Sequence, residues 1–94
     1  MLELKNKSVL ITGATHGIGL EILKKLTENK CRIVFFSKNK SRVKKTNLYL
    51  KKNKIKYYSE TLDVLNLKEV ENFLKNIKKK FSGIDILINN VGGG

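Results

Sequence analysis

Short apolar runs recur along the chain and alternate with longer segments in which the apolar residues are spaced apart. Each run is rich in Ile, Val, Leu or aromatic residues and lies close to Gly, Asn, Asp or Ser. Such runs are typical of buried strands in a parallel sheet. The predicted strands are residues 8–12 (SVLIT), 31–37 (CRIVFFS), about 55–59 within IKYYSETLDV, and 84–91 (IDILINNV).

The segments between these strands carry helical periodicity of unequal strength. In residues 17–28, three apolar residues fall four apart and mark one helix face: Ile18, Ile22 and Leu26. The next segment has the weakest pattern, with Asn39 or Ser41 as the candidate cap of a helix that reaches about Lys52.

The third helix has the clearest pattern. Asn66 and Glu69 are spaced as a capping box, and Ser82-Gly83 is the predicted stop. The apolar residues at helical spacing between them are Val70, Phe73, Leu74, Ile77 and Phe81.

These elements follow the order β-α-β-α-β-α-β, with short connections and no internal repeat. Strands that alternate with helices predict an α/β fold with a parallel sheet and right-handed crossovers. We expect a Rossmann-type sheet of strand order 3-2-1-4, the first half of a doubly wound fold plus one strand. The 94 residues are predicted to form one domain, residues 1–94.

The predicted fold leaves part of its sheet uncovered. Right-handed connections place the first two helices on one face and only the third on the other. One helix cannot cover the second face of four parallel strands, which are normally buried on both sides. The last strand would also form an exposed apolar edge. We therefore expect a truncated, incomplete doubly wound domain.

Basic residues outnumber acidic ones: 20 Lys and Arg against 8 Asp and Glu give a formal net charge of +12. Such a field attracts nucleic acid, anionic membranes or phosphorylated ligands. The lysines are spread over several predicted elements, however, and only Arg32 and Arg42 carry the forked donors that suit base and phosphate contacts. We interpret most of the charge as solvated surface and do not expect a nucleic-acid partner.

Signals for membrane insertion, export and metal binding are missing from the sequence. No apolar run approaches the ~20 residues that a membrane span needs. The N-terminus, MLELKNKSVLI, lacks the layout of a signal peptide. Cys31 is the single cysteine, which excludes a disulfide framework within the chain and a cysteine-based metal site. These features predict a cytoplasmic protein.

Three of the seven glycines follow the first predicted strand, in the stretch LITGATHGIGLEI. A helix that starts there points its unpaired N–H groups and its dipole at the loop, where they attract an anion such as pyrophosphate. Gly13, Gly17 and Gly19 suit positive φ, close ligand approach and tight helix-to-strand packing. The hydroxyls of Thr12 and Thr15 would lie within reach of phosphate. A glycine-rich corner without a ligand is the alternative.

Two further motifs follow predicted strands, at the sheet edge where open α/β sheets bind ligands. They are LDV at 62–64 and NNVGG at 89–93. Together with TGATHGIG at 12–19, they closely resemble the N-terminal half of the short-chain dehydrogenase/reductase family, in the subgroup with a T-G-x-x-x-G-I-G loop. The resemblance extends over essentially the whole chain.

This resemblance implies roles in binding a nicotinamide dinucleotide. The residues implied to border its pyrophosphate are Gly13, Thr15, Ile18 and Gly19, with Gly17 shaping the loop. Asp63 would accept a hydrogen bond from the adenine amino group, and the Val64 backbone would help to define that pocket. The alternative for Asp63 is a residue at a helix start, stabilised by the helix dipole.

The last motif is implied to contact the adenosine ribose. Asn90 and Gly92 would line the ribose, while Asn89 would brace the central sheet. Val91 departs from the alanine that the family usually has there, and we expect the branched side chain to crowd the nucleotide slightly without abolishing the site.

The end of the second strand bears on cofactor choice. An enzyme that uses NAD usually has an acid there, which binds the ribose 2′-OH and repels a 2′-phosphate. This chain has Ser37 and Lys38 instead, and His16 occupies a position where relatives that prefer NADP often carry Lys or Arg. We therefore favour NADP(H) over NAD(H). The alternative for Lys38 is one more solvated lysine.

The family's catalytic residues have no match in this sequence. Its reaction needs a serine after the fifth strand and a Tyr-x-x-x-Lys pair on a later helix. The three tyrosines, Tyr49, Tyr57 and Tyr58, are followed four residues on by Asn, Thr and Leu. The resemblance thus implies that the C-terminal catalytic half is absent. No catalytic residue is assigned, and hydride transfer by this chain alone is not expected.

Three functions remain as hypotheses. The first is the cofactor-binding portion of an oxidoreductase that, in complete form, transfers hydride between nicotinamide and a carbonyl or alcohol substrate. The second is a non-catalytic module that binds a nucleotide or docks on a partner. The third is nucleic-acid binding through the lysine-rich second helix. A homo-oligomer is compatible with each of these, and the substrate is left open.

Overall fold

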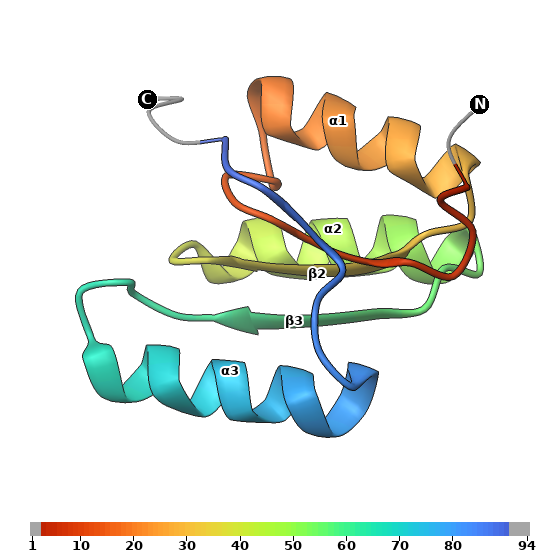
Figure 1. The fold of residues 1–94 in the computed structure, drawn as a ribbon. Helices are drawn as coiled ribbons and strands as arrows, with labels where there is room; N and C mark the ends of the chain where they lie inside the picture. The colour runs from red at the N-terminus through yellow and green to blue at the C-terminus, as the bar shows by residue number, and fades with distance from the viewer. Residues whose placement is uncertain (1–2, 91–94) are drawn as a thin grey trace.

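The computed structural model describes residues 3–90 and has three helices around a four-stranded sheet in that range (Figure 1). The elements are β1 (Ser8–Ile11), α1 (Gly17–Glu28), β2 (Arg32–Ser37), α2 (Lys40–Lys52), β3 (Tyr57–Thr61), α3 (Leu67–Phe81) and β4 (Ile86–Ile88). The predicted alternation of strands and helices is confirmed.

All strand pairs are parallel, and the strand order is β3-β2-β1-β4. The predicted order 3-2-1-4 is therefore confirmed. Helices α1 and α2 cover one face of the sheet, and α3 lies on the other (Figure 1). Because the strands are parallel, the segments that follow β1, β2, β3 and β4 all lie at one edge of the sheet.

The core has two parts, one on each face of the sheet. Along β2, alternate residues point to opposite faces, so Ile33 and Phe35 pack beneath α1 and α2 while Val34 packs against α3. The larger cluster also contains Val9, Ile11, Leu23 and Leu50, and the smaller one contains Leu62, Phe73, Ile77 and Phe81. Cys31 belongs to the larger cluster, and burial raises the pKa of its thiol.

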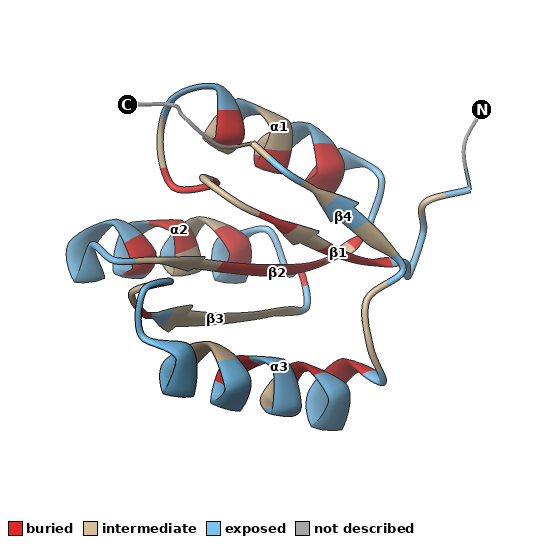
Figure 2. Ribbon diagram, turned by 60° about the vertical axis from the view of Figure 1, so that its left-hand side comes forward, coloured by how far each residue is buried: buried red, intermediate tan, exposed pale blue. Residues whose placement is uncertain are grey.

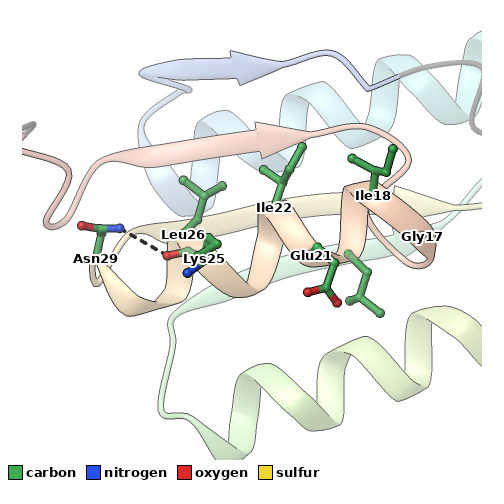
Figure 3. A pocket seen from close by; sticks show the side chains of 8 residues that line it. Gly17, Ile18, Glu21, Ile22, Lys25, Leu26 and Asn29 are labelled. Atoms are coloured by element: carbon green, nitrogen blue, oxygen red, sulfur yellow. Dashed lines mark hydrogen bonds between the residues drawn. The ribbon is translucent and has the colours of Figure 1, made fainter.

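The apolar stripe predicted on α1 meets the core only in part: Leu26 belongs to the larger cluster and Ile22 packs against it, whereas Ile18 does neither. Ile18, Ile22 and Leu26 do project from one side of α1, as Figure 3 shows. Of these three only Leu26 is buried, however, and Ile18 is 74% exposed. The buried positions of α1 also include Leu23, which the stripe did not contain. The three stripe residues also line an open hollow of about 690 Å³ along the helix.

The helix caps agree with the sequence in part. Asn39 caps α2, because its side chain accepts from the N–H of Arg42. Asn66 caps α3 by accepting from the N–H of Glu69 at 3.1 Å. The reciprocal half of the predicted capping box is wrong: the Glu69 carboxylate accepts from the N–H of Asp63 rather than from Asn66. Glu69 therefore fixes the loop that precedes the helix.

Two strand positions differ from the prediction. β3 starts at Tyr57, two residues later than expected, because Ile55 closes the turn after α2 and packs into the core. Its N–H donates to the carbonyl of Leu50 at 3.0 Å, so it stays with the helix. β4 has only three residues, which form their ladder with β1.

The sheet is incompletely covered, as predicted. Leu10 and Leu87 are neighbours in register on the face of α3, yet Leu10 is only half-buried and Leu87 is 62% exposed. Figure 2 shows a largely buried β2, whereas no residue of β4 is buried. None of the helices within residues 3–90 has the length and apolar content to cross a membrane.

Phe73 is the residue through which α3 is fixed to the sheet, and it gives the first prediction. Its ring lies 5.5 Å from that of Tyr58 and 5.6 Å from that of Phe36, measured between centroids. Phe73→Ala should lower the free energy of unfolding in urea by about 3–5 kcal/mol, since it leaves a cavity. The adjacent Leu74 is 53% exposed, and Leu74→Ala should cost less than about 0.5 kcal/mol. Equal losses would contradict this packing.

Candidate functional site

The loop between β1 and α1 folds so closely that two of its glycines admit no side chain. Gly13 has φ +61°, and a Cβ there would overlap the carbonyl oxygen of Asn90. A Cβ on Gly19 would overlap the carbonyl oxygen of Gly13 and crowd the Asn90 amide. Gly17 has φ +56° but open space around it. Gly13 in the loop and Gly19 in the first turn of α1 are required for close packing, whereas Gly17 is required only for the turn.

Hydrogen bonds join the end of β1 to the residues after β4. The Thr12 hydroxyl donates to Asn89 Oδ1 at 3.1 Å and accepts from the N–H of Asn90 at 2.8 Å. Asn90 Nδ2 in turn donates to the carbonyl of Gly13 at 3.3 Å. Asn89 thus lies where the expected bracing role puts it, while the Thr12 hydroxyl is engaged with both asparagines.

The start of α1 has no cap from a side chain, in contrast to the starts of α2 and α3. His16 holds the cap position with extended backbone, and its side chain makes no capping hydrogen bond. Its Nδ1 atom is buried without a hydrogen-bond partner. The first turn carries no acidic residue either. The helix dipole and the first-turn N–H groups therefore form a site suited to an anion.

The remaining positions of the loop differ in exposure. Thr15 is buried, whereas the Ile18 side chain is exposed at the start of the helix. The first therefore belongs to the packed loop, and the second is available for contact with a ligand.

A second group of predicted site residues gathers after β2 and β3. Lys38, Asp63 and Val64 line one hollow of about 380 Å³. Asp63 Oδ1 accepts from the N–H of Leu65 at 2.9 Å, so part of this carboxylate shapes its own turn. Ser37 Oγ accepts from the N–H of Asn39 at 3.1 Å, which places it at the start of α2.

The two groups share the edge at which the parallel strands end (Figure 1). Gly92 and Val91 lie outside the described residues. Two residues that the sequence reasoning missed belong to the second group. Phe36 lines the hollow beside Lys38, and Glu69 holds the Asp63 backbone. The capping-box spacing pointed to Glu69 but to a different partner.

The family model described as short chain dehydrogenase matches residues 7–94. The chain belongs to the short-chain dehydrogenase family. This assignment agrees with the fold and with the position of the glycine loop.

Relatives in the short-chain dehydrogenase family are considerably longer than this chain. A 3-oxoacyl-acyl-carrier-protein reductase from Buchnera aphidicola subsp. Schizaphis graminum is 38% identical over 97% of this chain, which spans 36% of that protein. L-Sorbose reductase from Gluconobacter frateurii, solved with NADPH and L-sorbose, has a TM-score of 0.85 at 26% identity, covering 99% of this chain and 36% of its own.

A second solved relative holds the other nicotinamide cofactor. A protein described as a candidate D-mannonate oxidoreductase from Haemophilus influenza, with bound NAD, has a TM-score of 0.85 at 28% identity. The match covers 98% of this chain and 33% of that one. The short-chain dehydrogenase relatives therefore include complexes with NADPH and with NAD.

The different demands on Gly17 and Gly19 give a second prediction. Asparagine tolerates positive φ, and space is open at position 17, so Gly17→Asn should cost less than about 1 kcal/mol. Gly19→Asn should cost about 3 kcal/mol or more, or prevent folding, because its Cβ meets backbone atoms that cannot move freely. Urea unfolding measures both, and a Gly19 variant as stable as the Gly17 variant would contradict the close approach.

Proposed function

We propose that this chain is the dinucleotide-binding part of a short-chain oxidoreductase, with the start of α1 as its pyrophosphate site. One observation carries the proposal: the helix start has no side-chain cap and lies beside the unpartnered Nδ1 of His16. Glycine is required at position 13 in the loop that leads to this helix and at position 19 in its first turn. A diphosphate would accept hydrogen bonds from the unpaired N–H groups in the first turn of α1 and so remove the cost of leaving them without a partner.

The rest of the dinucleotide is proposed to follow the strand ends. Asp63 and Val64 border a hollow that suits an adenine ring. One carboxylate oxygen of Asp63 accepts from Leu65, and the other is proposed to accept from the adenine amino group. Asn90 is held in place by the hydrogen bond from its N–H to the Thr12 hydroxyl, and it is proposed to contact the ribose together with Gly92. Family membership and the two cofactor-bound relatives support this arrangement.

A bound nicotinamide would supply hydride chemistry, in which hydride passes between its C4 atom and a carbonyl or alcohol carbon of a substrate. The residues of this chain are proposed to bind and orient the cofactor. The resemblance ties proton transfer to a Tyr-x-x-x-Lys pair, and no tyrosine of the sequence has a lysine four residues on. We therefore assign cofactor binding to residues 1–94. We assign the substrate chemistry to a region that corresponds to the part of the longer relatives not matched by this chain.

We also propose that NADP(H) is preferred over NAD(H). Lys38 lines the hollow that holds Asp63, and no acid follows β2 to repel a 2′-phosphate. Ser37 and His16 support the same preference from the starts of α2 and α1. A reducing cytoplasmic compartment is proposed from the single buried cysteine.

A charge change at position 17 tests the pyrophosphate site. Gly17→Asp places a carboxylate at the first turn of α1, where the dipole favours it, so helix stability should not fall relative to Gly17→Asn. The same carboxylate should repel a diphosphate and weaken NADPH binding by about tenfold or more relative to Gly17→Asn. Isothermal titration calorimetry measures the affinities, and thermal unfolding measures the stabilities. Equal NADPH affinity of the Asp and Asn variants would overturn the site.

A lysine pair tests the cofactor preference. Lys38→Ala should weaken NADPH binding by about fivefold and leave NADH binding unchanged, because only NADPH carries the 2′-phosphate. Lys45→Ala removes the same charge from an exposed position of α2 and should change neither affinity. A loss of NADH affinity equal to the loss of NADPH affinity would show that Lys38 does not discriminate between the cofactors.

A further inference from the structure

Five basic residues surround one hollow at the opposite edge of the sheet, where β1, β2 and β3 begin. This hollow, the basic pocket, has a volume of about 360 Å³ and is lined by Lys5, Lys30, Arg32, Lys54 and Lys56, together with Asn6, Cys31 and Ile55. None of the eight lining residues is acidic. The six residues of β2 separate this pocket from the proposed cofactor site by about 20 Å.

Backbone hydrogen bonds fix the three segments that form the basic pocket. The N–H of Asn6 donates to the carbonyl of Lys30 at 3.0 Å, and the N–H of Arg32 donates to Lys7 at 2.8 Å. The N–H of Ile33 donates to the carbonyl of Lys56 at 3.0 Å. Since all three segments are held to β2 or to its start, the backbone positions that carry the five cations are brought together before any ligand binds. This lowers the conformational cost of binding.

The C-terminal ends of two helices beside the basic pocket neutralise only part of its positive charge. α1 ends at Glu28 and α2 at Lys52, so both C-terminal ends lie near Lys30 and Lys54. Each end carries about half a negative charge, and the two together offset about one of the five cations. The other cations lie within a hollow whose size is comparable to the ~8 Å screening length at physiological salt, so they act on a ligand together.

Arg32 and Lys56 show how two of these cations are placed. The guanidinium carbon of Arg32 lies 5.1 Å from the centroid of the Phe81 ring, and Nζ of Lys56 lies 5.4 Å from the same centroid. Contact with the ring holds both side chains in place. Arg32 Nε is buried without a hydrogen-bond partner. An anion beside Arg32 would give this N–H group an acceptor.

We propose that the basic pocket binds a small, multiply charged phosphate anion of the size of a diphosphate or triphosphate group. The concave shape and the three converging segments favour a compact ligand over an extended one. A nucleic-acid backbone would instead require basic residues aligned along a surface. This site is separate from the proposed cofactor site and does not depend on it.

Titration of the 94-residue chain with inorganic pyrophosphate and tripolyphosphate tests the basic pocket. Amide chemical shifts of the isotope-labelled chain should change and saturate in segments 5–6, 30–32 and 54–56. The double variant Lys54→Gln/Lys56→Gln should weaken tripolyphosphate binding by about tenfold. The matched variant Lys44→Gln/Lys45→Gln, which loses the same charge from exposed positions of α2, should weaken it by less than about twofold.

Several results would overturn this proposal. Shift changes confined to the loop at 12–19 would assign the anion to the cofactor site, and equal weakening by both double variants would reduce the effect to net charge. Shift changes that do not saturate at millimolar tripolyphosphate would show that the basic pocket is not a binding site. A single-stranded RNA that binds more tightly than tripolyphosphate through the same amides, with a steep dependence on salt, would replace the small anion by a nucleic acid.

Discussion

The candidate site of this fold depends on how closely the loop after β1 approaches the residues that follow β4. Gly19 lies against the carbonyl of Gly13, and Gly13 lies against the carbonyl of Asn90, without room for a Cβ at either glycine. A side chain there would push the start of α1 away from the strand ends. This contact therefore fixes where the helix dipole points, while the hydrogen bonds of Thr12 keep the two strand ends together.

The two edges of the sheet favour anions by different physical means. At the carboxyl edge the attraction comes from backbone dipoles, which have a fixed direction and act at short range. At the amino edge it comes from the full charges of side chains such as Lys54 and Lys56, which salt screens more strongly. The polarity of parallel strands thus gives a strongly basic chain two proposed anion sites, one that would select by geometry and one that would select by charge.

Much of the fold follows from local signals, because strand runs and caps are encoded within a few residues. Asn66 capped α3 as expected, and the strand order followed from the alternation of elements. The inner face of α1 followed only in part, since apolar residues lie on several sides of that helix. Leu23 is buried there, and Ile18 is exposed.

The candidate site was predictable to a similar degree. Its motifs and the edge where they meet could be read from the sequence, but the bond between Thr12 and Asn89 joins residues 77 positions apart. The basic pocket was not predictable, because its lysines come from three separate segments and look like dispersed surface charge until the strands bring them together.

The short β4 has a consequence for the order in which the chain folds. Its pairing with β1 closes a loop of nearly the whole chain, as the bond between Ser8 and Asp85 illustrates, and long loops cost the most entropy to close. The units from β1 to β3 involve shorter separations and should form first. Pairing of β4 is therefore expected to be the last step of assembly, and it is also the step that brings Asn90 to the glycine loop. A ligand that bridged the loop and Asn90 would stabilise that final step, so the proposed cofactor binding would be thermodynamically linked to completion of the sheet.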